Sequence, residues 1–421
     1  MDTLLIKNIV HNGTVCDIFI RGGIIEDITG DCSRIADRTI DGKGMTVIPS
    51  FVNMHTHSGM TLFRGICEDM PLDRWLDAVW KAEKELDSEM IYWATRLACL
   101  EMIKSGTTAF TDMYWYIDRG ADAVAASGMK AVLCYCFLDG GDPAKQELQR
   151  EECMEMYRIS RSWPETVKFG VAIHAHYTVC DENMLWAADF ARKHSLPLHT
   201  HLSETESENI AHSDRYGISP TRRLSDLGIL GPDLIAAHCL WLDDNDIGLL
   251  GNAGVTTVHN VNSNLKLASG YRFRYNELRD AGANVALGTD GAGSSNNLDM
   301  LETMKTSALL QKAWRKDPTA MPIPEVFAAA SANGAKAMGI GDGKIAPGSP
   351  ADLLLVNTGS PCFMPPFDFH ANLLYAANSS AIDTVICNGR ILMEGRRVEG
   401  EEEIMENAAA QIDRFLKLIN K

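Results

Sequence analysis

The sequence from Ile48 to Arg64 reads Ile-Pro-Ser-Phe-Val-Asn-Met-His-Thr-His-Ser-Gly-Met-Thr-Leu-Phe-Arg. The apolar run from Thr46 to Val52 predicts a buried strand, and this strand ends at His55-Thr-His57. Side chains alternate between the faces of a strand, so His55 and His57 project from the same side. Two imidazoles placed in this way can bind one divalent cation, although two polar residues that close a strand are the commoner explanation of His-x-His alone. The rest of the chain decides between the two explanations.

The middle of the chain alternates apolar strands with helical patterns. The candidate strands are Thr46–Asn53, Thr107–Tyr114, Lys130–Leu138, Lys168–Tyr177, Leu196–Ser203, Leu234–Leu240, Val255–Val261 and Asn284–Thr289. The longest helical candidates are Leu72–Ser105, Lys145–Trp163 and Leu298–Lys312. Eight buried strands with helices between them are typical of an α/β fold of the (β/α)8 TIM-barrel type, and we predict this barrel over residues 48–343.

Short β segments separated by glycine-rich turns occupy both ends of the chain. Near the start they are Leu4–Ile9, Val15–Ile20, Ile24–Ile28 and Arg38–Ile40. Near the end they are the run from Gly343 to Val356, Thr384–Cys387 and Arg390–Met393. Neither set is long enough to bury itself, so we predict one small β-sandwich formed by residues 1–47 and 344–400. Residues 401–421 carry apolar side chains at helical spacing and predict a terminal helix.

Composition narrows the class of protein and its partners. The chain has 421 residues, 46% of them apolar and 23% charged, which is typical of a folded protein with a large core. A net charge of −17 disfavours nucleic acid and anionic membranes as partners. The N-terminal residues do not resemble a signal peptide, and the eleven cysteines form no Cys-x-x-Cys pair. We therefore expect a cytoplasmic enzyme that acts on a small molecule.

Further candidate ligands lie at the ends of other predicted strands, and in a barrel these ends form the active-site rim. They are His201 and Glu204 after the fifth strand, His238 after the sixth and Asp290 after the eighth. We predict that His55, His57, His201 and Asp290 bind one divalent metal ion, zinc first with iron or nickel as alternatives, and leave a position for water. Lys168 opens its strand at the wrong end to bridge two metals, so one ion is expected.

The order of these residues resembles the amidohydrolase superfamily. Three longer stretches are more closely similar to the 5'-methylthioadenosine/S-adenosylhomocysteine deaminases and their triazine-hydrolase relatives. They are residues 51–65 (FVNMHTHSGMTLFRG), 258–270 (VHNVNSNLKLASG) and 288–297 (GTDGAGSSNN). The resemblance covers nearly the whole chain, including both segments of the expected sandwich.

The resemblance implies a reaction in which a metal-bound hydroxide attacks C6 of an aminopurine. Glu204 would carry a proton to N1, Asp290 would handle the water proton, and His238 would stabilise the developing charge or weakly coordinate the metal. The implied substrate-binding residues are Glu83, His174, Glu204, Arg150, Trp75 and Ser294. A solvated helix carboxylate is an alternative for Glu83, and core packing is the expectation for Trp80. His176 stands where the family usually has proline, and we assign it no role.

The substrate range follows from the far end of the implied site. In the deaminases that this chain resembles, two arginines bind the amino-acid tail of S-adenosylhomocysteine. Tyr135 stands at the first position and Gln149 near the second, with Arg150 one residue further along. We therefore expect 5'-methylthioadenosine, 5'-deoxyadenosine or adenosine to be deaminated in preference to S-adenosylhomocysteine.

Two alternatives remain open from the sequence. One is an amidohydrolase that deaminates or dechlorinates another heterocycle, such as a guanine-like base, a pterin or a triazine. The other is a non-catalytic barrel that serves as a scaffold. The deaminase class that binds zinc through His-x-Glu and Pro-Cys-x-x-Cys is excluded, because the chain has neither motif. A homo-oligomer is expected.

Overall fold

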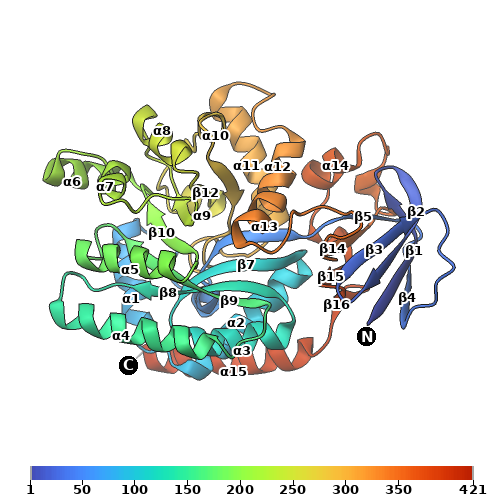
Figure 1. The fold of residues 1–421 in the computed structure, drawn as a ribbon, viewed down its shortest axis with the longest axis horizontal. Helices are drawn as coiled ribbons and strands as arrows, with labels where there is room; N and C mark the ends of the chain where they lie inside the picture. The colour runs from blue at the N-terminus through green and yellow to red at the C-terminus, as the bar shows by residue number, and fades with distance from the viewer. Residues whose placement is uncertain (1, 420–421) are drawn as a thin grey trace.

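The structure, a computed structural model, describes residues 2–419 and contains two sheets (Figure 1). Eight parallel strands of the described chain follow each other in sequence order around the first sheet. Their bounds are β6 (Phe51–Thr56), β7 (Thr107–Tyr114), β8 (Lys130–Phe137), β9 (Val167–Ala175), β10 (Leu198–Leu202), β11 (Leu234–His238), β12 (Thr256–His259) and β13 (Asn284–Leu287). The predicted (β/α)8 barrel is confirmed.

The barrel closes between β13 and β6 through a few polar contacts at the active-site end. The Asn53 side chain donates to Thr289 Oγ1 at 2.7 Å and accepts from the Thr289 amide at 3.0 Å. The Asp290 amide donates to the carbonyl of His55 at 2.9 Å. Because these bonds join the two strand ends directly, they hold the expected ligands His55 and Asp290 side by side.

Both ends of the chain form the second sheet, which has nine strands within the described residues (Figure 1). Its strands are β1 (Thr3–His11), β2 (Thr14–Arg21), β3 (Ile24–Thr29), β4 (Arg38–Asp41), β5 (Met45–Pro49), β14 (Leu353–Asn357), β15 (Ile382–Cys387), β16 (Arg390–Glu394) and β17 (Arg397–Val398). The two ends meet where β5 pairs antiparallel with β14, so the predicted association of the terminal segments is confirmed. The β1–β2 turn uses Asn12 and Gly13, both at positive φ.

The expected first barrel strand, Thr46–Asn53, is wrong because the chain changes sheets at Ser50. Pro49 still pairs with Leu353 in the outer sheet, whereas Phe51 pairs with Thr107 in the barrel. Both strands are buried, so a continuous apolar run gave no sign of the break. The outer sheet therefore extends through Pro49, two residues beyond the predicted boundary at residue 47.

Helices surround the barrel (Figure 1). Their bounds are α1 (Leu72–Glu83), α2 (Ser88–Lys104), α3 (Ile117–Ser127), α4 (Pro143–Ser160), α5 (Asp181–Lys193), α6 (Glu206–Tyr216), α7 (Pro220–Asp226), α8 (Asp244–Asn252), α9 (Val261–Lys266), α10 (Tyr275–Asp280), α11 (Met300–Arg315), α12 (Ile323–Ala330), α13 (Ala332–Met338), α14 (Phe369–Ala371) and α15 (Glu401–Ile419). The expected helix Leu72–Ser105 is two helices, because Asp87 caps a new helix by accepting from the amides of Glu89 and Met90.

The terminal helix α15 is confirmed through Ile419, and residues 420–421 of that prediction lie outside the described residues. It docks on α2 through the ion pair of Lys104 Nζ with Glu401, at 2.6 Å, and through the buried Phe415 ring. No helix in residues 2–419 combines the length and the apolar character that a membrane span requires.

Deleting residues 1–40 is expected to make the protein insoluble or to lower its melting temperature by more than about 10 °C. The deletion removes Leu4, Ile6, Ile18 and Ile20, which are buried and contribute roughly 1.5–3 kcal/mol each. It also leaves an unpaired edge on β5, which is prone to aggregate.

Solubility and thermal melting measure this effect. The matched control is Ile35→Ser, which changes a side chain of the same segment that is 95% exposed and is expected to leave melting unchanged. A truncated protein that stays soluble and melts like the full chain would contradict the assigned contribution of the terminal strands.

Candidate active site

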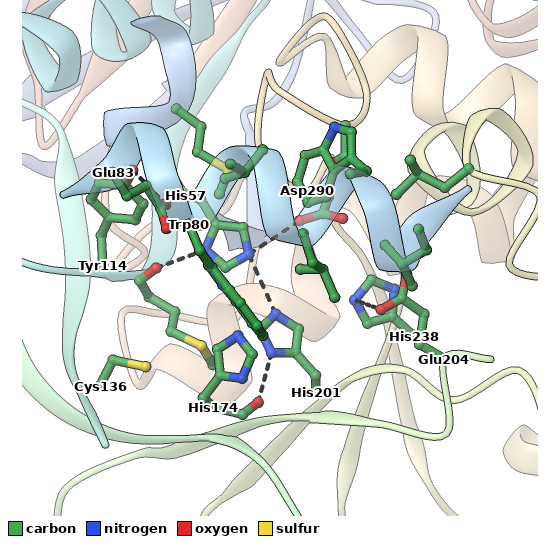
Figure 2. Close-up of a pocket in the computed structure, with 18 of the residues that line it drawn as sticks. His57, Trp80, Glu83, Tyr114, Cys136, His174, His201, Glu204, His238 and Asp290 are labelled. Carbon is green, nitrogen blue, oxygen red and sulfur yellow. Dashed lines mark hydrogen bonds and ion pairs between the residues drawn. The ribbon is translucent and has the colours of Figure 1, made fainter. Parts of the chain in front are cut away.

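A pocket opens at the C-terminal ends of the barrel strands, where the sequence placed the site (Figure 2). Most of the predicted site residues line it, from five strand ends and the loops after them. They are His57, Trp75, Glu83, His174, His201, Glu204, His238, Asp290 and Ser294. Figure 2 shows Glu83 and Tyr114 at one end of the pocket and Glu204 and His238 at the other. His55 lies behind this lining and is fully buried.

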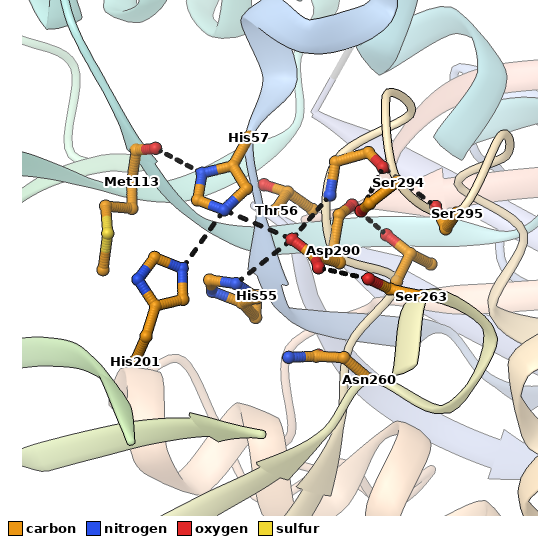
Figure 3. A network of polar contacts seen from close by, with 12 residues as sticks. His55, Thr56, His57, Met113, His201, Asn260, Ser263, Asp290, Ser294 and Ser295 are labelled. Atoms are coloured by element: carbon orange, nitrogen blue, oxygen red, sulfur yellow. Dashed lines mark hydrogen bonds and ion pairs between the residues drawn. The ribbon is translucent and has the colours of Figure 1, made fainter. Parts of the chain in front are cut away.

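The four predicted metal ligands converge on one point (Figure 3). Asp290 Oδ1 lies 3.2 Å from His57 Nε2 and 3.4 Å from His55 Nε2. His201 Nε2 lies 3.3 Å from His57 Nε2. The donor atoms of His55, His57 and Asp290, and likewise those of His55, His201 and His238, lie within 4.8 Å of one another. Imidazole nitrogens and a carboxylate in this arrangement suit a divalent transition metal.

Hydrogen bonds on the far side of each ring show that the donor atoms fit a cation. His57 Nδ1 donates to the carbonyl of Met113 at 2.7 Å, and His201 Nδ1 donates to that of His174 at 2.6 Å. These bonds place the Nδ1 protons away from the cluster and direct both Nε2 atoms, 3.3 Å apart, toward it. The two nitrogens can share a positive charge, either a proton on His57 or a metal ion that takes its place.

His55 is oriented in the same manner by a second histidine of the barrel, His199. Its Nδ1 lies 3.0 Å from Nε2 of His199, which is fully buried in the barrel. Burial holds the pKa of His199 well below its usual value, so the neutral ring can accept the Nδ1 proton and free Nε2 of His55. His199 thus supports a ligand from behind.

The electrostatics of the cluster also favour a cation. Burial lowers the pKa of His55 to about 4 and keeps that of His201 well below its usual value, so both rings stay neutral. Burial opposes a charge on His57 as well, but the Asp290 carboxylate outweighs it and raises the pKa of His57 to about 9. Burial raises the pKa of Asp290, yet His55 and His57 hold it well below the usual value. The carboxylate therefore remains ionised and attracts positive charge.

Local backbone features aim these side chains. The register between β6 and β7 shifts between Asn53 and Thr56, so that both His55 and His57 reach the cluster. Asp112 on β7 accepts from Thr56 Oγ1 and from the Ser58 amide, and so fixes the chain on both sides of His57.

At the ends of β10, β11 and β13, the non-glycine residues Ser203, His238 and Asp290 have positive φ values of 51°, 75° and 64°. Such strained positions are typical of functional sites, where the surrounding structure maintains them.

Glu204 and His238 face each other beside the ligand cluster. Glu204 Oε2 lies 3.7 Å from His238 Nε2, and Glu204 Oε1 accepts from Ser269 Oγ at 3.1 Å. Asn264 Nδ2 lies 2.9 Å from Nδ1 of His238 and fixes the plane of its ring. Burial raises the pKa of Glu204, which favours the protonated form of this carboxyl group.

The opposite end of the pocket consists of α1 and the ends of β7 and β9. Glu83 accepts from the Tyr114 hydroxyl at 2.9 Å, and burial raises the pKa of Glu83 to about 7. Glu83 is half-buried and bonded to Tyr114, so it is not the solvated helix carboxylate of the alternative. The His174 ring lies 6.3 Å from Trp80, which lines the pocket in contrast to its expected place in the core.

Trp75 and Ser294 are also in the pocket wall, as expected. Trp75 is 5% exposed, and Ser294 Oγ donates to the carbonyl of Gly291 at 3.1 Å.

Arg150 is the predicted site residue that the structure places elsewhere. It lies on α4, where its Nε donates to Asn183 Oδ1 at 2.6 Å, and it is not among the described residues of the pocket wall. The physical reason is that Gln149 bonds both the amide and the carbonyl of Leu138, which fixes the register of this helix. Lys168 binds the carbonyls of Met338 and Gly339 at the other end of the barrel, consistent with a single metal.

Sequence reasoning missed Tyr114, Trp115 and Cys136, which also line the pocket. Tyr114 ends β7 and Cys136 lies near the end of β8, so position at a strand end was the available signal. A strand end alone does not separate a pocket-lining residue from a packed one, because side chains alternate between the two faces of a strand.

Comparison with known proteins agrees with this geometry. The sequence model of the amidohydrolase family matches residues 46–392. A 5'-deoxyadenosine deaminase of Methanoregula boonei is 43% identical over 99% of this chain and 96% of its own. A 5-methylthioadenosine/S-adenosylhomocysteine deaminase of Pelotomaculum thermopropionicum is 43% identical over 91% of this chain and 88% of its own.

A solved structure gives the same result for the fold. The crystal structure of an adenosine deaminase from Xanthomonas campestris with bound zinc superposes with a TM-score of 0.91 at 30% identity, over 99% of this chain and 98% of its own. With the family match extending over most of the chain, from β5 through the whole barrel to β16, this protein belongs to the amidohydrolase family.

Proposed function

We propose that this protein is a hydrolytic deaminase of adenosine-type nucleosides, which converts 5'-deoxyadenosine, 5'-methylthioadenosine or adenosine to the inosine analogue and ammonia. The observation that carries the proposal is the convergence of His55, His57, His201 and Asp290 in a pocket that also holds Glu204. The deaminase names of relatives at 43% and 41% identity support the same reaction.

The ligand set supports one divalent ion per subunit. Zinc is our first choice, because the Xanthomonas adenosine deaminase has bound zinc and the donor set suits it, with iron or nickel as alternatives. When bound, such an ion lowers the pKa of water toward about 7 and so supplies a nucleophile at neutral pH.

The protein groups around this point divide the proton transfers between them. Glu204, whose pKa burial raises, would deliver a proton to N1 of the purine, which makes C6 more electrophilic. Asp290 stays ionised and would accept the proton of the attacking water. His238, whose Nε2 faces Glu204 at 3.7 Å, would stabilise the charge that develops at C6.

The other end of the pocket would hold the sugar. Glu83 is an acceptor that the Tyr114 hydroxyl orients, and two adjacent ribose hydroxyls are the natural donors to such a carboxylate. Trp80 and His174 lie beside it and would contact the face of the nucleoside. Trp75 and Ser294 form part of the remaining wall and would help to exclude water.

The residues that would surround the 5' substituent of the nucleoside favour small, uncharged groups. A hollow of about 750 Å3 adjoins the pocket and shares Glu83, Tyr114, Trp115 and Cys136 with it. Tyr135 lies in this hollow, and its hydroxyl donates to Glu152 at 2.7 Å. The hollow also contains Glu151 and Glu155, and among the described residues its carboxylates outnumber its one cation, Lys84, so a substrate carboxylate would meet net negative charge there.

We expect kcat/KM for 5'-deoxyadenosine to exceed that for S-adenosylhomocysteine by about ten- to a hundredfold, since a missing charge-assisted contact costs about 1.5–3 kcal/mol. We would measure kcat/KM for 5'-deoxyadenosine, 5'-methylthioadenosine, adenosine and S-adenosylhomocysteine on one preparation. Glu152→Gln keeps an acceptor for the Tyr135 hydroxyl and removes one negative charge. It should therefore lower the ratio of kcat/KM for 5'-deoxyadenosine to that for S-adenosylhomocysteine.

The matched control is Glu147→Gln, an exposed change on the same helix outside the hollow, which should leave the ratio unchanged. A wild-type preference for S-adenosylhomocysteine would contradict the proposed specificity.

An ammonia-release screen of adenosine derivatives, guanine-type bases, pterins and triazines on metal-replete protein tests the function itself. Release from the adenosine derivatives alone supports the proposal, and release from another heterocycle in their place refutes it. A cytoplasmic location, a homo-oligomeric state and the absence of nucleic-acid or membrane binding stay predictions. Size-exclusion chromatography of the purified protein tests the oligomeric state.

A further inference from the structure

A buried polar pair lies just outside the pocket and has no part in the mechanism above. Nε2 of His176 is 3.0 Å from Glu208 Oε1, and the two side chains are only 3% and 7% exposed. His176 follows β9, whereas Glu208 belongs to the first turn of α6. The His212 ring packs edge-on against His176, with ring centres 4.4 Å apart, and closes the pair from the other side.

Glu208 binds the backbone of the segment that carries Glu204. Its Oε1 accepts from the Ser203 amide at 3.1 Å, and its Oε2 accepts from the amides of Glu204 and Thr205 at 2.9 and 3.4 Å. Three consecutive N–H groups therefore point at one carboxylate. Ser203 has a positive φ of 51°, a conformation that needs such support in a residue with a side chain.

His176 determines how this carboxylate is turned. A carboxylate only accepts hydrogen bonds, so Nε2 of His176 must carry the proton and donate it to Oε1. Nδ1 of His176 is buried and makes no hydrogen bond within the described residues, which fits an unprotonated nitrogen. With Oε1 held by His176, Oε2 remains directed at the Glu204 amide. Burial raises the pKa of Glu208, but His176 and the backbone amides outweigh it and lower that pKa.

We propose that His176 is a positioning residue, which acts through Glu208 to hold Glu204 at the distance that proton transfer requires. The inference rests on the proposed role of Glu204. It concerns a residue at which this chain departs from the proline that its family usually has. A misplacement of about 1 Å in such a group can lower the rate by roughly 100-fold. His176 therefore contributes to kcat without contacting the reacting atoms.

A pair of amide variants separates the donor from the bulk of the ring. In His176→Gln the amide nitrogen can take the place of Nε2, so kcat for 5'-deoxyadenosine should stay within about threefold of wild type. In His176→Asn the amide reaches only the place of Nδ1, so kcat should fall by about 10- to 100-fold. KM and metal content should change by less than about twofold in both variants. Equal losses in the two variants would overturn the proposal.

A double-mutant cycle shows whether the effect passes through Glu204. In a Glu204→Gln background, His176→Asn should cause little further loss, because the group that it positions no longer transfers protons. If the two losses multiply, His176 acts independently of Glu204 and the proposal is wrong.

Hydrogen exchange separates this inference from the function that it assumes. Residues 203–208 should exchange faster in His176→Asn than in wild type or His176→Gln, whatever substrate the enzyme uses. Unchanged exchange in His176→Asn overturns the positioning role, whereas inactivity of wild-type protein on every adenosine derivative overturns the proposed function alone.

Discussion

Glu204→Gln is expected to lower kcat for 5'-deoxyadenosine by about 10²- to 10⁴-fold, the usual contribution of a positioned general acid. The variant conserves the size of the side chain and the acceptor for Ser269 Oγ, but its amide cannot give up a proton to the purine. The burial that raises the pKa of Glu204 favours the proton-donating form of the native carboxyl. Because the ligand atoms are unchanged, metal content should equal that of wild type.

The matched control is Glu206→Gln, which makes the same chemical change two residues along, on an exposed side chain. It should leave kcat within about twofold of wild type, as expected for a surface position. Near-normal kcat in Glu204→Gln, or loss of its metal, would show that Glu204 has been given the wrong role.

His55→Ala is expected to remove metal and activity together. His55 is fully buried and its Nε2 converges with those of His57 and His201, so alanine leaves one ligand position empty. The loss of metal affinity should exceed the roughly 10- to 100-fold that is typical when a residue behind a ligand is changed. His199→Ala provides the comparison for such a supporting residue, because His199 contacts Nδ1 of His55 and not the Nε2 that faces the cluster.

Metal content by mass spectrometry, measured beside activity, distinguishes His55→Ala from Glu204→Gln. The matched control is His11→Ala in the outer sheet, whose ring contacts Asn12 and which should retain both metal and activity. Full metal content in His55→Ala would contradict the ligand assignment.

The ligand set was predictable from sequence because it follows strand ends. His55, His57 and His201 lie in the last two residues of an apolar strand or directly after it, and Asp290 lies three residues beyond one. Parallel strands in a barrel bring their C-terminal ends to one rim, so residues far apart in sequence meet without any knowledge of the loops. The barrel and the pairing of the terminal segments were predictable for a related reason, because strand patterns are local.

The chain break at Ser50 and the place of Arg150 were not predictable from such patterns. Pro49 and Phe51 are apolar neighbours in one continuous run, and only their partners show that they belong to different sheets. Arg150 is excluded from the pocket by the bonds of Gln149 with Leu138, which connect residues eleven apart. Tertiary hydrogen bonds of this kind leave no periodic trace in a sequence.

The residues that hold the site residues in place could not be predicted from the sequence for the same reason. Tyr114 orients Glu83, and His199 stands behind His55, across contacts that span 31 and 144 residues. Glu208 can be recognised as a capping residue of α6, but its pairing with His176 depends on how the loops after β9 and β10 fold against each other. A residue type at a strand end thus predicts a ligand, whereas its supporting partner requires the structure.

The central claim, hydrolytic replacement of the C6 amino group, is tested most directly by turnover of 5'-deoxyadenosine in oxygen-18 water by the zinc-loaded protein. The account predicts one ammonia released per nucleoside consumed and one labelled oxygen at C6 of a 5'-deoxyinosine product. Fully metallated protein that forms no labelled product from any adenosine derivative would contradict it.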